Sequence, residues 1–470
     1  MSYYNSQNTF INNINNLHFQ NLNYSKLNNP TQKSNSFVEN GNRVLSKVNT
    51  LPYQKINKNP YMREKSFFQN QKFSGTDNYQ SIDYNNSFGG SSRRKRTGED
   101  FSNYNFNQNT NNYKYFDDNK EKNIINDNED NNSNDKLYSI VLSKIGLNNL
   151  GDTCYMNVCL QNLIHSRCFI KDLLSKRSII NARKTPITKE FLNLCEKMSV
   201  SRTSSIEPSD FRYTFCKKHK QFGKYAQFDT IEFCRFLLED ISSELNEIKE
   251  RAPYRELSTF GKSKLQCLKE FEELCRSKES SIVVDNFYGS IINIFTCTCY
   301  YETYSFQVFL DIPLLLPGGT DRTSINDLLY DYFKKESINF NTRCEKCQKK
   351  KVHDKEMKLS KIPRILILSL QRMDERTNRK NNCEVKFDER LNLDDYIDDE
   401  CQNTNKYIYY LYGVWCHAGN INYGHYYSYI KINDKDWYQF NDSKVIYTGN
   451  IETTSKYAYV LFYKKRRRSN

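Results

Sequence analysis

The stretch IGLNNLGDTCYMNVCLQNLI, residues 145–164, joins a polar turn to the start of a helix. Gly146 and Gly151 give the first half backbone freedom. From Cys154 onward, apolar residues recur at the spacing of a helix with one buried face. Cys154 is therefore predicted at a helix N-terminus, where free N–H groups and the helix dipole favour a thiolate. Asn149 is a candidate amide donor to an oxyanion forming beside the sulfur. The alternative is a structural cysteine next to a turn.

The composition of the 470-residue chain changes near residue 135. Asn accounts for 33 of the first 135 residues, whereas all 15 Cys lie from Cys154 onward. We therefore expect a disordered Asn-rich tail over residues 1–135, followed by a folded body. The odd Cys count and the lack of a signal-like apolar N-terminus indicate a reducing, intracellular compartment, either cytoplasm or nucleus. No apolar run approaches the roughly 18 residues of a membrane span, so no membrane association is expected.

The net charge of +14 is concentrated in part in two basic clusters, residues 93–96 and 464–468. Such runs serve as nuclear import signals or anion-binding patches, or are simply solvated charge at chain ends. No recognisable nucleic-acid-binding module accompanies them. Nucleic acid is therefore not an expected partner.

Helical patterns come first in the folded body and strand patterns follow. Residues 186–200, 207–222 (with a helix start at Ser209) and 227–248 have helical patterns. In the third, apolar residues recur in steps of three and four from Ile231 to Ile248. Strand patterns begin after residue 282 and include 291–295, 306–312, 365–370 and a set from Tyr407 onward. This order predicts an α+β fold with a mainly antiparallel sheet.

Asp229 and Glu232 stand one turn apart at the start of the third helix. They fit a capping box, in which Asp229 caps the helix and Glu232 answers it three residues later. They also fit a carboxylate pair that binds a basic ligand. Both interpretations can hold together.

Two cysteine pairs have metal-ligand spacing. Cys344 and Cys347 form a Cys-x-x-Cys pair, and Cys297 and Cys299 form a tighter Cys-x-Cys pair. Two such pairs predict a tetrahedral structural Zn²⁺ site. The alternative is four reduced cysteines at strand ends.

A candidate general base lies near the C-terminus. His425 follows Gly424 at the start of a predicted strand, and the next strand bends at Asn441 and Asp442. An acceptor at that bend can fix the tautomer of His425. Cys154, His425 and Asn441 would then form a thiol protease triad, with Asp442 as the competing third member. His417 is expected to line the same cleft.

These motifs resemble a known family, the ubiquitin-specific proteases. GLNNLGDTCYMNVCLQNL resembles the family's cysteine box, and YGHYYSYIK followed by WYQFNDSKV resembles its histidine box. Between them, QFDTIEFCRFLLE is similar to the Gln/Asp box and IPRILILSLQRM to a family strand. YAYVLFYKKR is similar to the closing strand. The resemblance covers about residues 141–465 in the family's order, which we take as the catalytic domain.

The resemblance implies a papain-like fold, with a helical thumb, an antiparallel-sheet palm and zinc-ribbon-like fingers. It implies a deubiquitinase that hydrolyses the isopeptide or peptide bond after the C-terminal glycine of ubiquitin. Its expected partners are ubiquitin and ubiquitinated proteins, with regulatory partners possible through the tail. The implied roles are Cys154 as nucleophile, His425 as base, Asn441 as third triad member and Asn149 as oxyanion donor. The implied tail-binding residues are Asp229, Glu232, Gln227, His417 and Gly424, and the implied zinc ligands are Cys297, Cys299, Cys344 and Cys347.

Three positions depart from the family pattern. Asn441 stands where Asp is an alternative, Phe228 replaces a Gln, and the Cys297–Cys299 pair is one residue short. Two rival functions remain at this point. One is a catalytically weak ubiquitin-binding scaffold of the same fold, and the other is a zinc-ribbon nucleic-acid-binding protein.

Overall fold

A computed structural model describes residues 136–465, except 225, 251–256, 340–342, 350–351, 375–378, 402–406 and 422. The chain divides into units Met1–Asn126 and Asp127–Asn470, and every described residue belongs to the second. The predicted tail, the basic cluster 93–96 and residues 466–468 of the other cluster lie outside the described residues. Among the described helices, none has both the length and the apolar character to cross a membrane.

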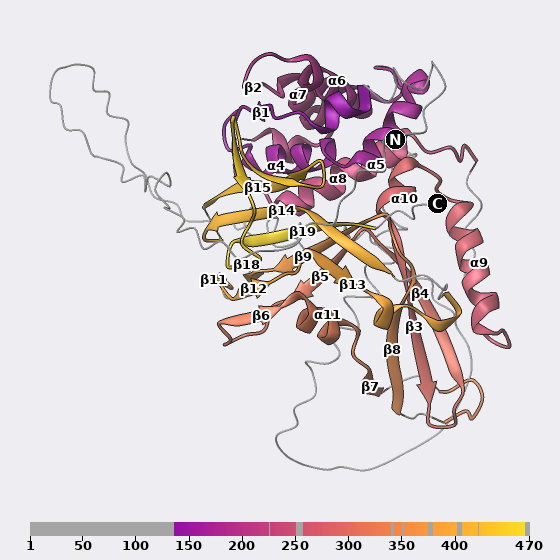
Figure 1. Ribbon diagram of the computed structural model, residues 1–470. Coiled ribbons are helices and arrows are strands. Elements are labelled where there is room, and N and C mark those ends of the chain that lie inside the picture. Colours follow the sequence, from indigo (N-terminus) through magenta and orange to yellow (C-terminus); the bar gives the residue numbers. More distant parts are fainter. Residues whose placement is uncertain are drawn as a thin grey trace, which may run out of the picture. The chain divides into compact units, whose positions relative to one another are not determined.

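The described body begins with helices, as the sequence predicts (Figure 1). The helices are α4 (Cys154–Ile164), α5 (Arg167–Ser175), α6 (Pro186–Val200), α7 (Ser209–Lys218), α8 (Thr230–Glu244), α9 (Lys264–Arg276), α10 (Ile282–Phe287) and α11 (Ile325–Phe333). The predicted helix 186–200 is confirmed at both ends, and the predicted start at Ser209 is confirmed. The prediction that the third helix continues to Ile248 is wrong, because the Asn246 side chain accepts the N–H of Ile248 and turns the chain away.

The largest sheet has eight strands in the order β17-β16-β15-β14-β19-β9-β5, with β13 paired to β14. Its strands are β5 (Asp311–Leu315), β9 (Ile365–Gln371), β13 (Arg390–Asn392), β14 (Ile408–Gly419), β15 (Gly424–Ile432), β16 (Asp436–Asn441), β17 (Lys444–Gly449) and β19 (Ala458–Lys465). The predicted antiparallel character is confirmed, with the β5–β9 pair parallel. Figure 1 shows helices α4 to α8 gathered on one side of this sheet.

Alternating residues of the central strands enter two different cores. On β9, Ile365 and Ile367 pack with the helices, whereas Leu366 and Leu368 pack with α11 on the other face. The period-two geometry of a strand makes this alternation necessary. The sheet is therefore covered on both faces, which fixes the positions of β14 and β15 against α4.

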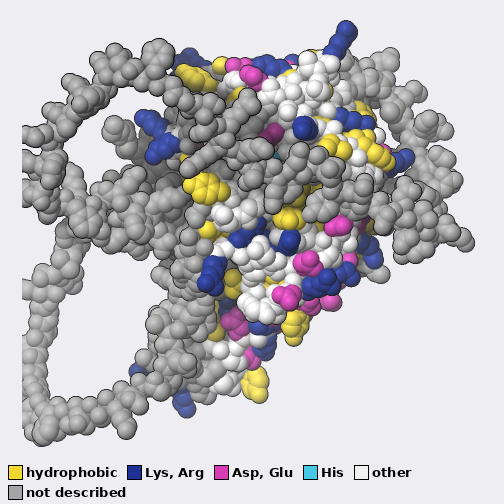
Figure 2. Space-filling view, turned by 90° about the vertical axis from the view of Figure 1, so that its left-hand side faces the viewer, with side chains coloured by type: hydrophobic (Ala, Val, Ile, Leu, Met, Phe, Trp, Pro, Cys, Tyr) yellow, Lys and Arg dark blue, Asp and Glu magenta, His cyan; other side chains and the backbone are white. Residues whose placement is uncertain are grey.

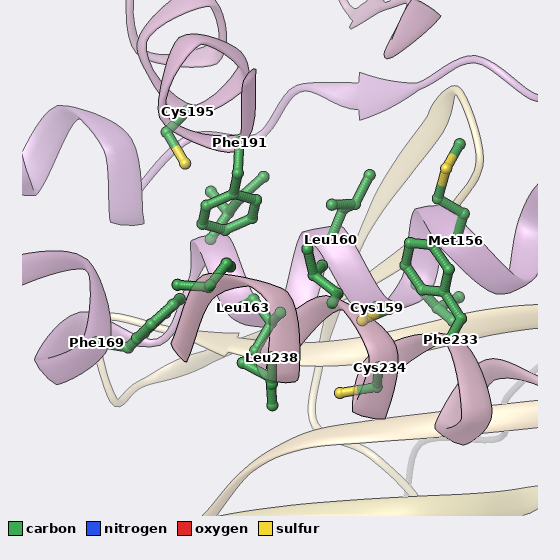
Figure 3. Close-up of a cluster of buried hydrophobic side chains, with 14 of the residues drawn as sticks. Met156, Cys159, Leu160, Leu163, Phe169, Phe191, Cys195, Phe233, Cys234 and Leu238 are labelled. Carbon is green, nitrogen blue, oxygen red and sulfur yellow. The ribbon is translucent and has the colours of Figure 1, made fainter. Parts of the chain in front are cut away.

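Helix α4 is buried on every side. All eleven of its residues are buried, so the prediction of one buried face is wrong. The helix contacts α8 on one side and β15 on another. Figure 3 shows its Cys159 and Leu163 among apolar side chains of neighbouring helices, including Cys234 and Leu238 of α8. Its buried polar side chains must therefore bond within the protein, and one of them matters for the site.

A second sheet, in the order β4-β3-β8-β7, is antiparallel throughout and extends away from helices α4 to α8 (Figure 1). Its strands are β3 (Gly289–Cys297), β4 (Glu302–Phe309), β7 (Glu336–Asn339) and β8 (Val352–Lys361). The smaller pairings involve β1 (Gly146–Leu147), β2 (Ser205–Ile206), β6 (Arg322–Ser324), β10 (Met373–Asp374), β11 (Arg379–Lys380), β12 (Glu384–Lys386) and β18 (Thr454–Ser455). The predicted α+β organisation is confirmed.

Candidate active site

The loop before Cys154 is shaped by its own polar side chains. The Asn149 Oδ1 accepts the backbone N–H of Gly151 at 3.0 Å and of Thr153 at 3.1 Å. Gly151 has a φ of 90°, which confirms the backbone freedom expected of it. Cys154 follows as the first residue of α4, at the predicted helix N-terminus.

Gly146 serves a different purpose, which is close backbone approach. A Cβ at Gly146 would lie 2.4 Å from the carbonyl oxygen of Ser443. The next residue, Leu147, donates its N–H to the carbonyl of Asp442 at 2.9 Å. The cysteine loop is thereby attached to the bend that follows β16.

Burial opposes ionisation of the Cys154 thiol, against the predicted bias towards a thiolate. Its residue is only 3% exposed, and burial raises the thiol pKa to about 11. Hydrogen bonds from the backbone of Tyr426 and Tyr155 lower the pKa, and the nearby Asp442 carboxylate raises it. Loss of water outweighs the helix N-terminus here because a buried charge is costly. A base is therefore required to remove the thiol proton.

His425 is oriented by Asn441. Its Nε2 lies 2.7 Å from the Asn441 Oδ1, whereas the nearest Asp442 oxygen is 4.0 Å away. Donation by Nε2–H to an amide oxygen leaves the Nδ1 lone pair as the basic site. Tyr426, the residue after His425, is the one whose backbone bonds the Cys154 sulfur. The pairing of His425 with Asn441 fits the predicted triad better than pairing with Asp442.

Asp442 instead links the cysteine region to the sheet. One carboxylate oxygen accepts from Asn149 Nδ2 at 2.9 Å, and the other accepts from Asn157 Nδ2 at 2.8 Å. Asn157 also donates to the carbonyls of Leu147 and Asn148, which directly precede Asn149. Asn149 Nδ2 carries two N–H groups, so one remains for an oxyanion. Sequence reasoning missed Asn157, although it is a polar residue at i+3 from Cys154.

Asp229 caps α8 and has a further partner. Its Oδ1 accepts the N–H of Ile231 at 2.9 Å and of Glu232 at 3.0 Å, while the Tyr459 hydroxyl donates to its Oδ2. The capping role is therefore confirmed. A ligand that binds Asp229 must share a carboxylate that already accepts three hydrogen bonds. Tyr459, on the closing strand, had no signal in the sequence that linked it to Asp229.

Gln227, Gly424 and His417 form one contact group next to His425. The Gln227 side-chain amide makes two hydrogen bonds of 2.8 Å with the backbone N–H and carbonyl of Gly424. His417 is buried, and burial with the nearby Lys380 cation lowers its pKa to about 3. These contacts occupy the groups that were predicted to bind substrate, so a supporting role for the three residues is favoured.

An open polar depression of about 510 Å³ adjoins this site. It is lined by Asn148, Asn149, Glu207, Asn441, Asp442, Ser443 and Lys444. The depression therefore reaches both the oxyanion candidate and the third triad residue from the solvent side.

The four predicted metal ligands come together at one end of the second sheet. Their Sγ atoms all lie within 4.8 Å of one another, with Cys297–Cys347 at 3.9 Å and Cys299–Cys344 at 3.7 Å. Cys297 ends β3, and Cys299 lies in the turn after it. A tetrahedral thiolate zinc site has S–S distances of about 3.8 Å, given Zn–S bonds of about 2.3 Å. The cluster therefore fits a metal ion.

The described surface also bears on the nucleic-acid alternative. On the face in Figure 2, Lys and Arg side chains lie interspersed with Asp and Glu wherever described residues are visible. A mixed surface of this kind lacks the single-sign field that favours a polyanion.

Comparison with known proteins gives a consistent result. The family model described as ubiquitin carboxyl-terminal hydrolase matches residues 145–463. Ubiquitin carboxyl-terminal hydrolase 4 of Saccharomyces cerevisiae is 29% identical over 361 residues, covering 68% of this chain and 39% of the relative. Human ubiquitin carboxyl-terminal hydrolase 21 is 28% identical over 372 residues, covering 70% of this chain and 64% of the relative. The chain thus spans less than two thirds of the length of these relatives.

Solved structures share the fold. The SAGA DUB module Ubp8/Sgf11/Sus1/Sgf73 bound to ubiquitin aldehyde matches with a TM-score of 0.56 and 25% identity, over 70% of both chains. The same module bound to monoubiquitin matches with a TM-score of 0.55 and 25% identity, over 71% of this chain and 70% of the other.

Proposed function

This chain belongs to the ubiquitin carboxyl-terminal hydrolase family, and from that membership we propose that it is a cysteine-type deubiquitinase. It hydrolyses the isopeptide or peptide bond after the C-terminal glycine of ubiquitin. The observation that carries the proposal is the hydrogen bond of 2.7 Å between His425 and Asn441. His425 lies on the same strand as Tyr426, whose backbone bonds the Cys154 sulfur. The ubiquitin named with the structural neighbours supports ubiquitin as the partner here.

In the mechanism, His425 Nδ1 takes the thiol proton as Cys154 Sγ attacks the carbonyl of the terminal glycine. The remaining N–H of Asn149 Nδ2 stabilises the tetrahedral oxyanion. The imidazolium of His425 then protonates the leaving lysine amine, the C–N bond breaks and a thioester remains. His425 next removes a proton from water, which attacks the thioester and releases ubiquitin and the thiol.

The raised thiol pKa assigns a definite task to His425. Because burial raises the thiol pKa, His425 has to take the proton from Cys154 for the sulfur to attack. Asn441 is neutral, so it orients the imidazolium without the charge stabilisation that a carboxylate provides.

We also propose that Cys297, Cys299, Cys344 and Cys347 hold a structural Zn²⁺. The support is the fit between their Sγ distances and a tetrahedral thiolate site. A bound ion would join the β3–β4 turn to the segment between β7 and β8. Such an ion stabilises the fold and takes no part in the bond cleavage.

The test is reaction of the purified chain with ubiquitin that carries a C-terminal electrophile. We expect a covalent adduct of one ubiquitin per chain on Cys154, together with release of a C-terminal fluorogenic amide. Cys168→Ala is a matched control, since this half-buried cysteine lies on α5 rather than in the site. A chain that binds ubiquitin yet forms no adduct would support the non-catalytic scaffold instead.

A further inference from the structure

Lys380, at the end of β11, directs its ammonium group at the end of β14. Its Nζ lies 2.6 Å from the carbonyl oxygen of His417, 3.2 Å from that of Gly419 and 3.0 Å from His417 Nδ1. An ammonium group has three N–H donors, so it can donate to both carbonyls and also to His417 Nδ1 in the tautomer that leaves Nδ1 unprotonated. A neutral amine has only two donors and cannot make all three of these bonds.

The end of β14 is the part of the sheet that supports His425. In the β14–β15 pairing, Ala418 lies opposite His425 and Gly419 lies opposite Gly424. The backbone that Lys380 holds is therefore the backbone paired with the catalytic histidine.

The ring of His417 carries the same constraint to Gly424. A Cβ at Gly424 would lie 2.1 Å from His417 Nε2, so the ring packs directly on the glycine backbone. Gln227 holds the same glycine through its two amide hydrogen bonds. Gly424, the residue before His425, is thus held between the His417 ring, which Lys380 orients, and the side-chain amide of Gln227, which precedes α8.

We propose that Lys380 is a positioning residue for catalysis, whose ammonium group fixes the end of β14 and the His417 ring and thereby places His425. The inference rests on the proposed deubiquitinase function, in which His425 is the base. Displacements of about 1 Å at a catalytic group cost on the order of 10²-fold in rate, so a backbone support of this kind has a measurable effect.

The groups around Lys380 make its charge sensitive to pH. Burial, and next the Arg372 cation, lower the pKa of Lys380 to about 8, while Cys416 opposes them. The facing His417 has a lowered pKa of about 3 and so remains a neutral acceptor. Lys380 is therefore charged below about pH 8 and loses its third donor above it.

Other titratable and charged groups face this cluster, among them His425, which acts on His417. The rings of Tyr426 and Tyr459 pack around His417, and burial raises the pKa of Tyr426 well above its ordinary value. Arg372 keeps a pKa of about 10 although burial lowers it. From β10, Asp374 lies opposite Arg379 in the strand pairing.

The test uses the whole chain and ubiquitin with a C-terminal fluorogenic amide, with kcat and KM measured from pH 6.5 to 9.5. For the wild type we expect kcat to fall above about pH 8. Lys380→Met should lower kcat at pH 7 by at least tenfold, leave KM within twofold and abolish the alkaline fall. Lys380→Arg should keep more activity than Lys380→Met and move the fall to higher pH, because a guanidinium stays charged.

Lys358→Met is the matched control, since Lys358 also donates to a backbone carbonyl, that of Asp395, but lies on the second sheet. An unchanged kcat and pH profile in Lys380→Met, or an equal loss of kcat in Lys358→Met, would overturn the proposal. If Lys380→Met does not fold, the Lys380→Arg profile decides, and an alkaline fall at the wild-type pH overturns the proposal. A wild type that cleaves no ubiquitin amide at any pH would refute the proposed function itself.

Discussion

The active site and the cysteine cluster are assembled in opposite ways. The active site takes Cys154 from a helix, His425 from β15 and Asn441 from β16, and it is braced by polar side chains around them. The cluster takes one pair of cysteines from each of two turns, and each cysteine contributes one sulfur atom. The proposed active site has many partial supports, whereas the cluster depends on the one Zn²⁺ ion proposed above.

This difference has a practical consequence. Loss of one support in the active site should reduce the rate by a factor and leave the fold in place. Loss of the metal ion from the cluster should destabilise the whole end of the second sheet, because metal-binding free energy is also folding free energy. The first three predictions below use this contrast, and the fourth concerns the buried thiols Cys154 and Cys416.

The largest effect is expected at the triad. Cys154→Ala should abolish turnover, because it removes the proposed nucleophile and the other thiol on α4, Cys159, is fully buried. Asn441→Ala should lower kcat by about 10²–10³-fold with little change in KM, since it removes the acceptor that orients His425. Steady-state kinetics on a ubiquitin amide measures both effects.

Asp442 provides the control for this assignment. Asp442→Ala should lose rate by releasing Asn149 and Asn157. Its effect should therefore be non-additive with that of Asn149→Ala, whereas a third triad member would couple to His425 instead. Additive losses for Asn149 and Asp442, with Asn441→Ala near wild type, would reverse the assignment.

The next largest effect is expected on stability, at the cysteine cluster. Purified protein should contain about one zinc per chain, as a single tetrahedral site requires. Chelation or Cys344→Ser should lower the melting temperature, whereas Cys275→Ser on α9 should change it little. Metal analysis and thermal melting measure these outcomes. A metal-free protein that melts like the zinc-loaded one would show that the four thiols are simply reduced cysteines.

Local patterns predicted the fold well, and the reason is visible in particular elements. The helix 186–200 and the Gly424–His425 strand start depend on nearby residues, so spacing alone located them. The cysteine pairs were also predictable, because each pair lies within one turn. The sequence could not predict that α4 is buried on all sides or that burial raises the pKa of the Cys154 thiol. Both follow from tertiary burial, which overrides the helix N-terminus.

Partners distant in sequence were the other part that patterns could not supply. Tyr459 bonds Asp229 across 230 positions, and Lys380 reaches His417 from a separate strand. A single residue on a short strand, such as Lys380, or on the closing strand, such as Tyr459, leaves no repeating pattern in the sequence that would identify its partner. Asn157 was nearer to prediction, since a buried polar residue on a helix needs a partner.

A smaller effect separates the two interpretations of Asp229. Asp229→Asn keeps a good helix cap but removes the charge, so the free energy of unfolding should change little. Asp229→Ala should cost about 0.5–2 kcal/mol of stability, because the two capped N–H groups lose their acceptor. If the carboxylates bind a basic ubiquitin tail, Asp229→Asn and Glu232→Arg should both raise KM while melting within a few degrees of wild type. Normal KM in both variants would leave Asp229 as a cap alone.

The smallest expected effect is a gradual loss of stability at alkaline pH. Burial raises the pKa of Cys416 to about 12 and that of Cys154 to about 11, from an ordinary thiol value of 9.0. In the unfolded chain these thiols ionise near pH 9, whereas in the folded chain they stay protonated to higher pH. The stabilisation from such raised groups is complete below about pH 9 and is lost as the pH rises through 11 to 12. The melting temperature should therefore fall steadily above pH 9. Cys416→Ala should weaken that slope relative to its own melting temperature at pH 7.5. A melting temperature that is constant from pH 8 to 11 would contradict this account, because buried thiols would then ionise as readily as exposed ones.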